Sequence, residues 1–102
     1  MASRERLAEQ IARRGVPFVF GIPGSGASLE LLDALERRGV AFYLCHFEGS
    51  AAMMAATVGR LTGRAGVVIS IKGPGVANLL PGLALAHFEA FPLVAIAEAY
   101  GV

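Results

Sequence analysis

The chain has 102 residues, the size of one compact domain. Hydrophobic residues make up 55% of it and charged residues only 17%, with nine Lys and Arg against eight Asp and Glu. This apolar, nearly neutral composition excludes a disordered chain, and it argues against a nucleic-acid partner because no basic excess is present to meet a polyanion.

Helical and strand patterns alternate along the whole chain. In order, we expect a helix around residues 7–12 ended by Gly15, a strand over 16–20, a helix over 28–38, a strand over 40–45, a helix over 48–61, a strand over 66–71, a helix over 76–88 and a strand over 93–97. Leu29, Leu32 and Leu35 are the expected inward face of the second helix. Strict alternation with short connections predicts a doubly wound α/β fold, whose four parallel strands lie in the order 2-1-3-4 with helices on both faces.

The unusual residues of the chain follow its strands. Gly21–Gly26 comes after the first strand, Glu48 after the second, and Lys72–Gly75 after the third. In doubly wound sheets, ligands bind beyond the carboxyl ends of the strands. The sequence therefore places its candidate functional residues at one edge of the sheet.

The Gly21–Gly26 segment does not fit the known phosphate loops. Gly21 and Gly26 have the separation of a Walker loop, but Ala27 occupies the position of its lysine. The glycine spacing also differs from the dinucleotide fingerprint, although Glu48 lies at a distance suited to its acidic residue. A ligand-facing turn and a purely structural tight turn both stay open.

Glu48 is an acid at the start of a helix in apolar surroundings. It follows Phe47, and no further charge occurs before Arg60. One interpretation is a first-turn carboxylate, which the helix dipole favours by about 0.3–1 kcal/mol. The other is a buried carboxylate that meets a hydrogen-bond donor from a ligand, because the cations fall mostly on outer faces. The residues alone leave both interpretations open.

Gly73-Pro74-Gly75 opens the fourth helix, with Asn78 one turn later. The two glycines would let a ring, another backbone or a subunit approach closely, and Asn78 can donate or accept a hydrogen bond. The alternative is ordinary turn and cap chemistry.

Taken together, these segments resemble the N-terminal pyrimidine-binding domain of thiamine-diphosphate-dependent enzymes, in the group of acetolactate synthase, pyruvate oxidase and benzoylformate decarboxylase. The matching residues are Phe20-Gly21-x-Pro23-Gly24, Glu48, Arg60-x-Thr62-Gly63, Gly73-Pro74-Gly75-x-x-Asn78 and Phe91-Pro92-Leu93-Val94. One departure is Phe47, which stands where the family usually has a histidine before the glutamate.

The resemblance implies a role for each matching residue. Glu48 would be catalytic, with its carboxylate bonded to a pyrimidine ring nitrogen of thiamine diphosphate so that the aminopyrimidine is activated. The other cofactor-binding residues would be Pro23, Gly24, Gly73, Pro74, Gly75 and Asn78. Ser25 would contact the carboxylate of a 2-keto acid substrate.

The resemblance also implies a missing partner. The family holds diphosphate and magnesium with a Gly-Asp-Gly motif, whereas the only aspartate here is Asp33, which stands in no such motif. We expect residues 1–102 to form part of a pyrimidine-binding domain with no metal ligands of its own. A diphosphate-binding domain or subunit would hold the magnesium, in a homo- or hetero-oligomer. The alternatives are a truncated, non-catalytic α/β subunit or interaction module, and a flavodoxin-like nucleotide-binding domain.

Cysteine, histidine and terminal patterns complete the sequence interpretation. One cysteine and two distant histidines give neither a thiolate cluster nor local zinc-ligand spacing. The N-terminus is charged, and no apolar run approaches the roughly 18–20 residues of a membrane span. We therefore expect a soluble, cytoplasmic protein without membrane contact.

Overall fold

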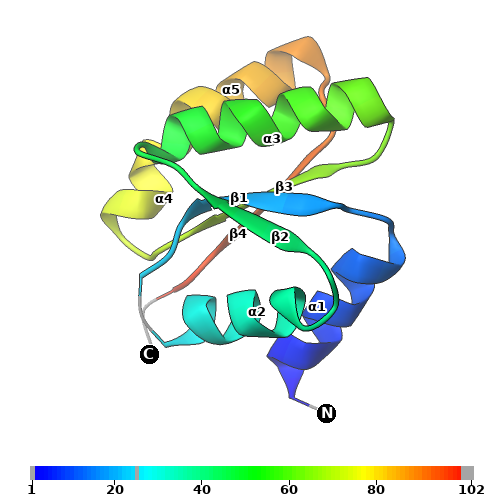
Figure 1. The fold of residues 1–102 in the computed structure, drawn as a ribbon. Coiled ribbons are helices and arrows are strands. Elements are labelled where there is room, and N and C mark those ends of the chain that lie inside the picture. The colour runs from blue at the N-terminus through cyan, green and yellow to red at the C-terminus, as the bar shows by residue number, and fades with distance from the viewer. Residues whose placement is uncertain (1, 25, 100–102) are drawn as a thin grey trace.

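The computed structural model describes residues 2–24 and 26–99 of the chain. Its elements are α1 (Ser3–Arg13), β1 (Phe18–Ile22), α2 (Ala27–Glu36), β2 (Ala41–Leu44), α3 (Glu48–Thr62), β3 (Gly66–Ser70), α4 (Pro74–Asn78), α5 (Leu80–Glu89) and β4 (Leu93–Ala97). The strands form one parallel sheet in the order β2-β1-β3-β4, as Figure 1 shows. The predicted fold class and strand order are confirmed.

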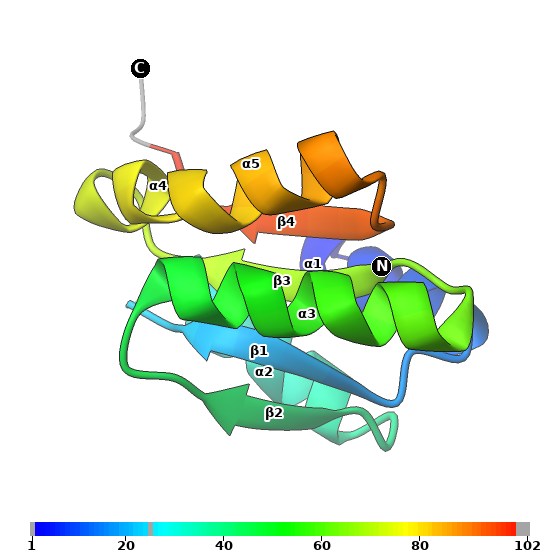
Figure 2. The same ribbon diagram turned by 90° about the horizontal axis from the view of Figure 1, so that it is seen from above.

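The sheet lies between two helical layers. Helices α1 and α2 cover one face, and α3 and α5 cover the other (Figures 1 and 2). Every residue of β3 is buried, because this strand is central and both of its faces are covered. Apolar clusters fill both layers, one around Val19 and Leu35 and the other around Val68 and Leu79.

The predicted helix over residues 76–88 is wrong as a single element. The structure has a short α4 that begins at Pro74, followed by a separate α5, and Leu79 stands between them. Pro81 explains the break because a proline has no N–H and its ring clashes with the carbonyl four residues earlier. Pro81 instead lies within the first turn of α5, where helices tolerate proline.

The predicted inward face of α2 is only partly right. Leu35 is buried, but Leu29 is 49% exposed and Leu32 is only partly buried. The buried stripe instead runs through Ser28, Leu31, Ala34 and Leu35. Leu29 and Leu32 each follow a residue of this stripe by one position, which turns them about 100° around the helix axis.

Ion pairs join the two helices of the first layer. The Glu5 carboxylate of α1 bonds both Arg37 and Arg38, which follow α2, and Arg4 pairs with Glu30. Hydrogen bonds from Arg37, and secondly from Arg38, hold the pKa of the Glu5 carboxyl below its usual value. Within the described residues, no helix has the length and apolarity that a membrane span requires.

Candidate functional site

The three predicted site segments lie at the same end of the sheet. All strands are parallel, so the residues that follow β1, β2 and β3 emerge together at their carboxyl ends. Figure 2 shows the strand arrowheads, the start of α3 and all of α4 at this end. The candidate functional site is therefore this edge.

Glu48 is the first residue of α3, and it is only 9% exposed. The side chain has no hydrogen-bond donor or cation partner among the described residues. The amino end of a helix favours a carboxylate, but a buried carboxylate without a donor is costly. The side chain of Glu48 as a whole is thus largely buried, but its carboxylate oxygens are not among the fully buried atoms without a partner, so they can still meet a ligand.

Gly75 lies directly against this carboxylate. A Cβ atom placed on Gly75 would be 3.5 Å from Oε2 of Glu48 and would overlap the hydroxyl oxygen of Ser70. Ser70 is fully buried at the end of β3, and its hydroxyl donates to the Ile71 carbonyl. The structure thus brings the predicted Glu48 and Gly75 together, and a side chain at Gly75 would overlap Ser70 and Ile71.

Gly73 and Pro74 form the start of α4. Gly73 has a φ of 72°, which favours glycine, and Pro74 occupies the first turn of the helix, where its missing N–H costs nothing. The Asn78 carbonyl lies 3.1 Å from the position of a Cβ on Gly49, so the end of α4 meets the start of α3. Asn78 itself is exposed.

Pro23 and Gly24 belong to the same edge and are partly buried. The Gly24 N–H donates to the Ser28 hydroxyl over 3.1 Å, and a Cβ on Gly24 would overlap the side chain of Ile71. The same Ile71 side chain lies against Gly75. Ile71 therefore connects the turn after β1 with the glycine beside Glu48. Ser25, the predicted substrate contact, lies outside the described residues.

Sequence reasoning missed three residues that shape this edge. Ser28 fixes the Gly24 backbone, Ile71 connects the two loops, and Ser70 fills the space beside Gly75. For Ser28 there was a signal, because a serine in the first turn of a helix often bonds nearby backbone groups. Ile71 and Ser70 looked like ordinary strand residues.

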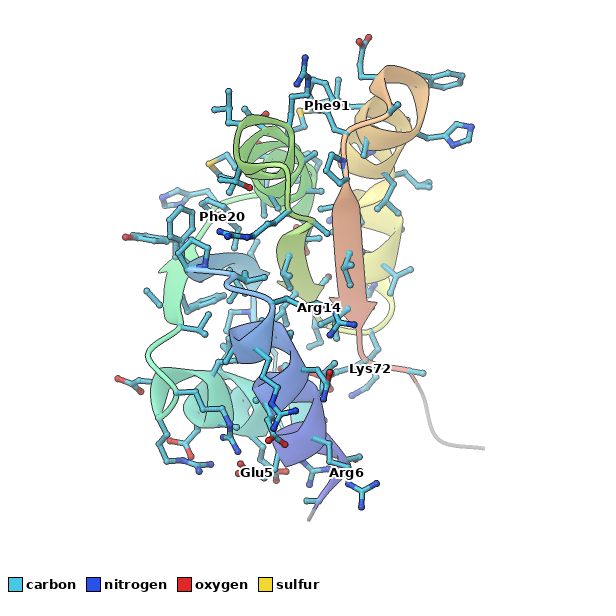
Figure 3. All side chains as sticks on the ribbon, turned by 90° about the vertical axis from the view of Figure 1, so that its right-hand side faces the viewer. Glu5, Arg6, Arg14, Phe20, Lys72 and Phe91 are labelled. Atoms are coloured by element: carbon cyan, nitrogen blue, oxygen red, sulfur yellow. The ribbon has the colours of Figure 1, made fainter. Side chains whose placement is uncertain are left out.

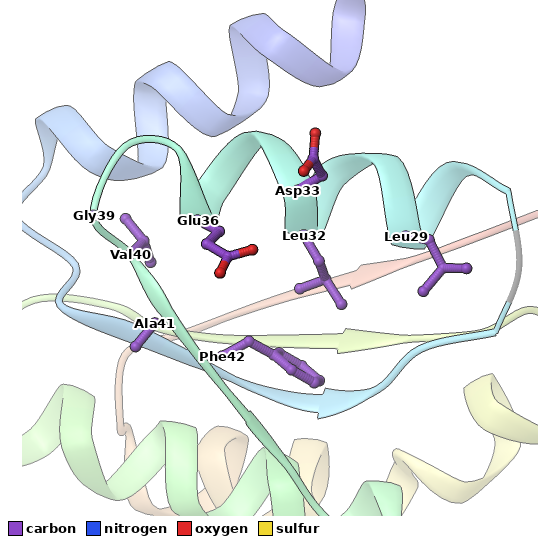
Figure 4. Close-up of a pocket in the computed structure, with 8 residues that line it drawn as sticks. All are labelled: Leu29, Leu32, Asp33, Glu36, Gly39, Val40, Ala41 and Phe42. Atoms are coloured by element: carbon purple, nitrogen blue, oxygen red, sulfur yellow. The ribbon is translucent and has the colours of Figure 1, made fainter.

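A broad groove of about 660 Å³ lies elsewhere, along α2 beside the edge strand β2 (Figure 4). It is lined by Leu29, Leu32, Asp33, Glu36, Gly39, Val40, Ala41 and Phe42. None of the predicted site residues is among them. Within residues 2–24 and 26–99, no three His, Cys, Asp or Glu side chains gather to hold a metal ion.

Comparisons with known proteins match the whole chain to one family model and to several relatives. The family model described as "Thiamine pyrophosphate enzyme, N-terminal TPP binding domain" matches residues 1–102. The chain is 43% identical to an acetolactate synthase of Bacillus subtilis (strain 168) over 93 residues, which are 91% of this chain and 16% of the relative.

Two further relatives carry related names. The chain is 43% identical to the "Acetolactate synthase isozyme 2 large subunit" of Escherichia coli (strain K12) over 96 residues, 94% of this chain and 17% of the relative. It is 36% identical to a probable acetolactate synthase large subunit of Methanocaldococcus jannaschii over 96 residues, 94% of this chain and 16% of the relative. The chain thus spans only 16–17% of the length of these relatives.

Proposed function

The chain belongs to the family of thiamine pyrophosphate enzyme N-terminal TPP binding domains, and on that premise we propose that it is the pyrimidine-binding part of a thiamine-diphosphate-dependent enzyme. The enzyme would act on 2-keto acids, as a decarboxylase or as an acetolactate synthase. The observation that carries this proposal is Glu48 at the start of α3, a largely buried acid whose Oε2 lies 3.5 Å from the position of a Cβ on Gly75.

The residues at this edge fit the pyrimidine end of the cofactor. A flat aminopyrimidine ring with a basic nitrogen needs a desolvated carboxyl group that can share a proton with that nitrogen, and small residues where the ring approaches the backbone. Glu48 would provide the carboxyl group, and the turn from Gly73 to Gly75 that opens α4 would provide the small residues. When bound, thiamine diphosphate supplies the nucleophilic carbon that attacks a keto group.

In this proposal each residue of the chain has a distinct task. Glu48 shares a proton with the ring nitrogen. Its position at the start of α3 holds the side chain in place, and the helix dipole favours the negative charge of its carboxylate. Pro23 and Gly24, held by the Ser28 hydroxyl, together with the Gly73–Gly75 turn, form the walls beside the ring. Asn78 contributes a polar group at the rim, and Ser25 contacts the substrate carboxylate.

We propose that diphosphate and magnesium bind to a separate domain or subunit. Magnesium requires hard oxygen ligands, and the only aspartate of the chain, Asp33, pairs with Arg37 at the distant groove. The edge that carries Glu48 would then form one wall of a site that a second domain completes.

A chimeric enzyme tests the proposal. The matching segment of the Bacillus subtilis acetolactate synthase, 93 residues long, is replaced by this chain, and acetolactate formation is measured with thiamine diphosphate and magnesium. We expect turnover from the chimera and none from the chain alone. A folded chimera that binds the cofactor but shows no turnover would favour the non-catalytic module.

Gly75→Ala tests whether the Gly73–Gly75 turn beside Glu48 contacts the cofactor. The added methyl group overlaps Ser70 and Ile71 and so displaces the turn beside Glu48. We therefore expect thiamine diphosphate to bind the chimera about tenfold or more weakly, in the range of a 1–3 kcal/mol overpacking cost. Calorimetric titration measures the affinity. Val76→Ala, at a 43% exposed position of the same helix, is the control and should leave the affinity unchanged. Equal affinities for both variants would contradict the proposed contact.

A further inference from the structure

Glu98 directly follows β4 and contacts both ends of the segment that leads from β3 toward α4. Its backbone N–H donates to the Ser70 carbonyl over 3.2 Å. Its carboxylate pairs with Lys72, with 3.9 Å between Oε2 of Glu98 and Nζ of Lys72. Figure 3 shows Lys72 near the end of β4. Glu98 therefore holds the chain at two points, at the last residue of β3 and two residues later.

Ile71 lies between these two points and contacts both loops of the candidate site. A Cβ atom on Gly24 or on Gly75 would overlap the Ile71 side chain. Any shift of the Ser70–Lys72 segment would therefore move Ile71 against both glycines. The position of this segment thus determines how the turn before α4 lies beside Glu48.

The first turn of α4 begins directly after Lys72. The Gly73 carbonyl accepts hydrogen bonds from the N–H groups of Val76 and Ala77, over 3.0 and 3.2 Å. A glycine backbone has more conformational freedom than that of any other residue, so Gly73 alone does not fix the direction in which α4 starts. The ion pair of Lys72 with Glu98 restrains the chain on the N-terminal side of this turn.

The burial of Glu98 argues for a role in geometry more than in stability. Its side chain is 12% exposed, and its Oε1 atom is buried with no hydrogen-bond partner among the described residues. An unpaired buried carboxylate oxygen costs free energy, and a buried ion pair is often no more stabilising than apolar residues of similar size. A gain in stability therefore does not explain a glutamate at this position, whereas a fixed position for the segment does.

We propose that the Lys72–Glu98 pair positions the Gly73–Gly75 turn for the pyrimidine end of thiamine diphosphate. The inference rests on the function proposed above, in which this turn forms a wall beside the ring. Lys72 and Glu98 are positioning residues, because they act through the turn and not by contact with the cofactor. Loss of the pair loosens the first turn of α4 before any cofactor binds, and weaker cofactor binding is the consequence.

Lys72→Met in the chimeric enzyme tests this proposal, because methionine keeps an apolar stem and removes the charge. Hydrogen exchange followed by mass spectrometry should show faster exchange at Val76 and Ala77 in the chimera without cofactor. Calorimetric titration should show thiamine diphosphate bound about fivefold more weakly. Lys72→Arg keeps the charge and should retain the original exchange and affinity. Lys72→Met combined with Glu98→Gln should bind no more weakly than Lys72→Met alone, since one substitution already breaks the pair.

Arg38→Met is the matched control, because Arg38 also belongs to a partly buried ion pair, with Glu5 of α1. It should leave the cofactor affinity and the exchange at the start of α4 unchanged. Either an unchanged exchange rate or an unchanged affinity in Lys72→Met overturns the proposal, and so do additive losses in the double variant. A chimera without these substitutions that binds no thiamine diphosphate contradicts the proposed function instead, and the exchange rates then still decide whether the pair positions the turn.

Discussion

Glu48→Gln should lower acetolactate formation by the chimera about 10²–10⁴-fold, the usual contribution of a positioned acid or base. Glutamine has nearly the same shape and can occupy the same buried place at the start of α3. Its amide cannot share a proton with a ring nitrogen, so binding should persist while turnover falls. Steady-state kinetics together with calorimetric titration of thiamine diphosphate separate the two effects.

Glu89→Gln is the control for this substitution. Glu89 is an exposed residue at the end of α5, and that end of the helix lies away from α4 (Figure 2). Its loss of charge should leave the turnover number unchanged. If Glu48→Gln keeps more than about a tenth of the turnover, the carboxylate has no acid–base task of the usual size, and the non-catalytic module becomes the better hypothesis.

The topology was predictable because it depends on patterns that are local in sequence. Apolar runs such as 66–71 identified the buried strands, and a doubly wound sheet with helices on both faces requires a reversal in strand order, as in β2-β1-β3-β4. The position of Glu48 followed from the same reasoning, because residues after parallel strands share one edge. The apolar residues on both sides of Glu48 were compatible with its burial, but they did not decide between a buried and a first-turn carboxylate.

The contacts inside the site were not predictable. The position of Gly75 beside Glu48 and Ser70 depends on how the end of β3 and the starts of α3 and α4 pack together. No pattern local in the sequence encodes that packing. The broken fourth helix was predictable in principle from Pro81, but the apolar periodicity on both sides of it suggested one element. The exposed Leu29 shows a related limit, since composition does not tell which apolar residues of a helix face the sheet.

The depth at which α3 packs on the sheet depends on glycines. A Cβ atom on Gly66, the first residue of β3, would overlap the backbone carbonyl of Ala55 in α3. A Cβ on Gly59 of the same helix would overlap the Pro92 carbonyl. Both obstacles are backbone atoms, which cannot rotate away as the end of a side chain can. α3 therefore approaches the sheet closely only because these positions lack side chains.

Gly66→Ala should consequently destabilise the fold more than a typical glycine substitution. We expect a loss of about 3 kcal/mol or more in the free energy of unfolding, at the upper end of overpacking costs, and a fall of roughly 10–20 °C in Tm. Urea unfolding followed by circular dichroism measures both the midpoint and the slope. A loss of this size is a large share of the 5–15 kcal/mol of a typical domain.

Gly63→Ala separates steric overlap from backbone strain. Gly63 ends α3 with a φ of 74°, and a Cβ there would meet nothing within 4 Å, so its cost should be only the roughly 1–2 kcal/mol of a left-handed residue. Equal losses of stability for Gly63→Ala and Gly66→Ala would show that α3 can move away from β3 at little cost.

Glu48 and Ala55 lie two turns apart on the same helix, α3. The close packing of Ala55 against Gly66 therefore also fixes how far the Glu48 carboxylate lies from the sheet and from Gly75. The close contact at Gly66 is thus part of what positions Glu48.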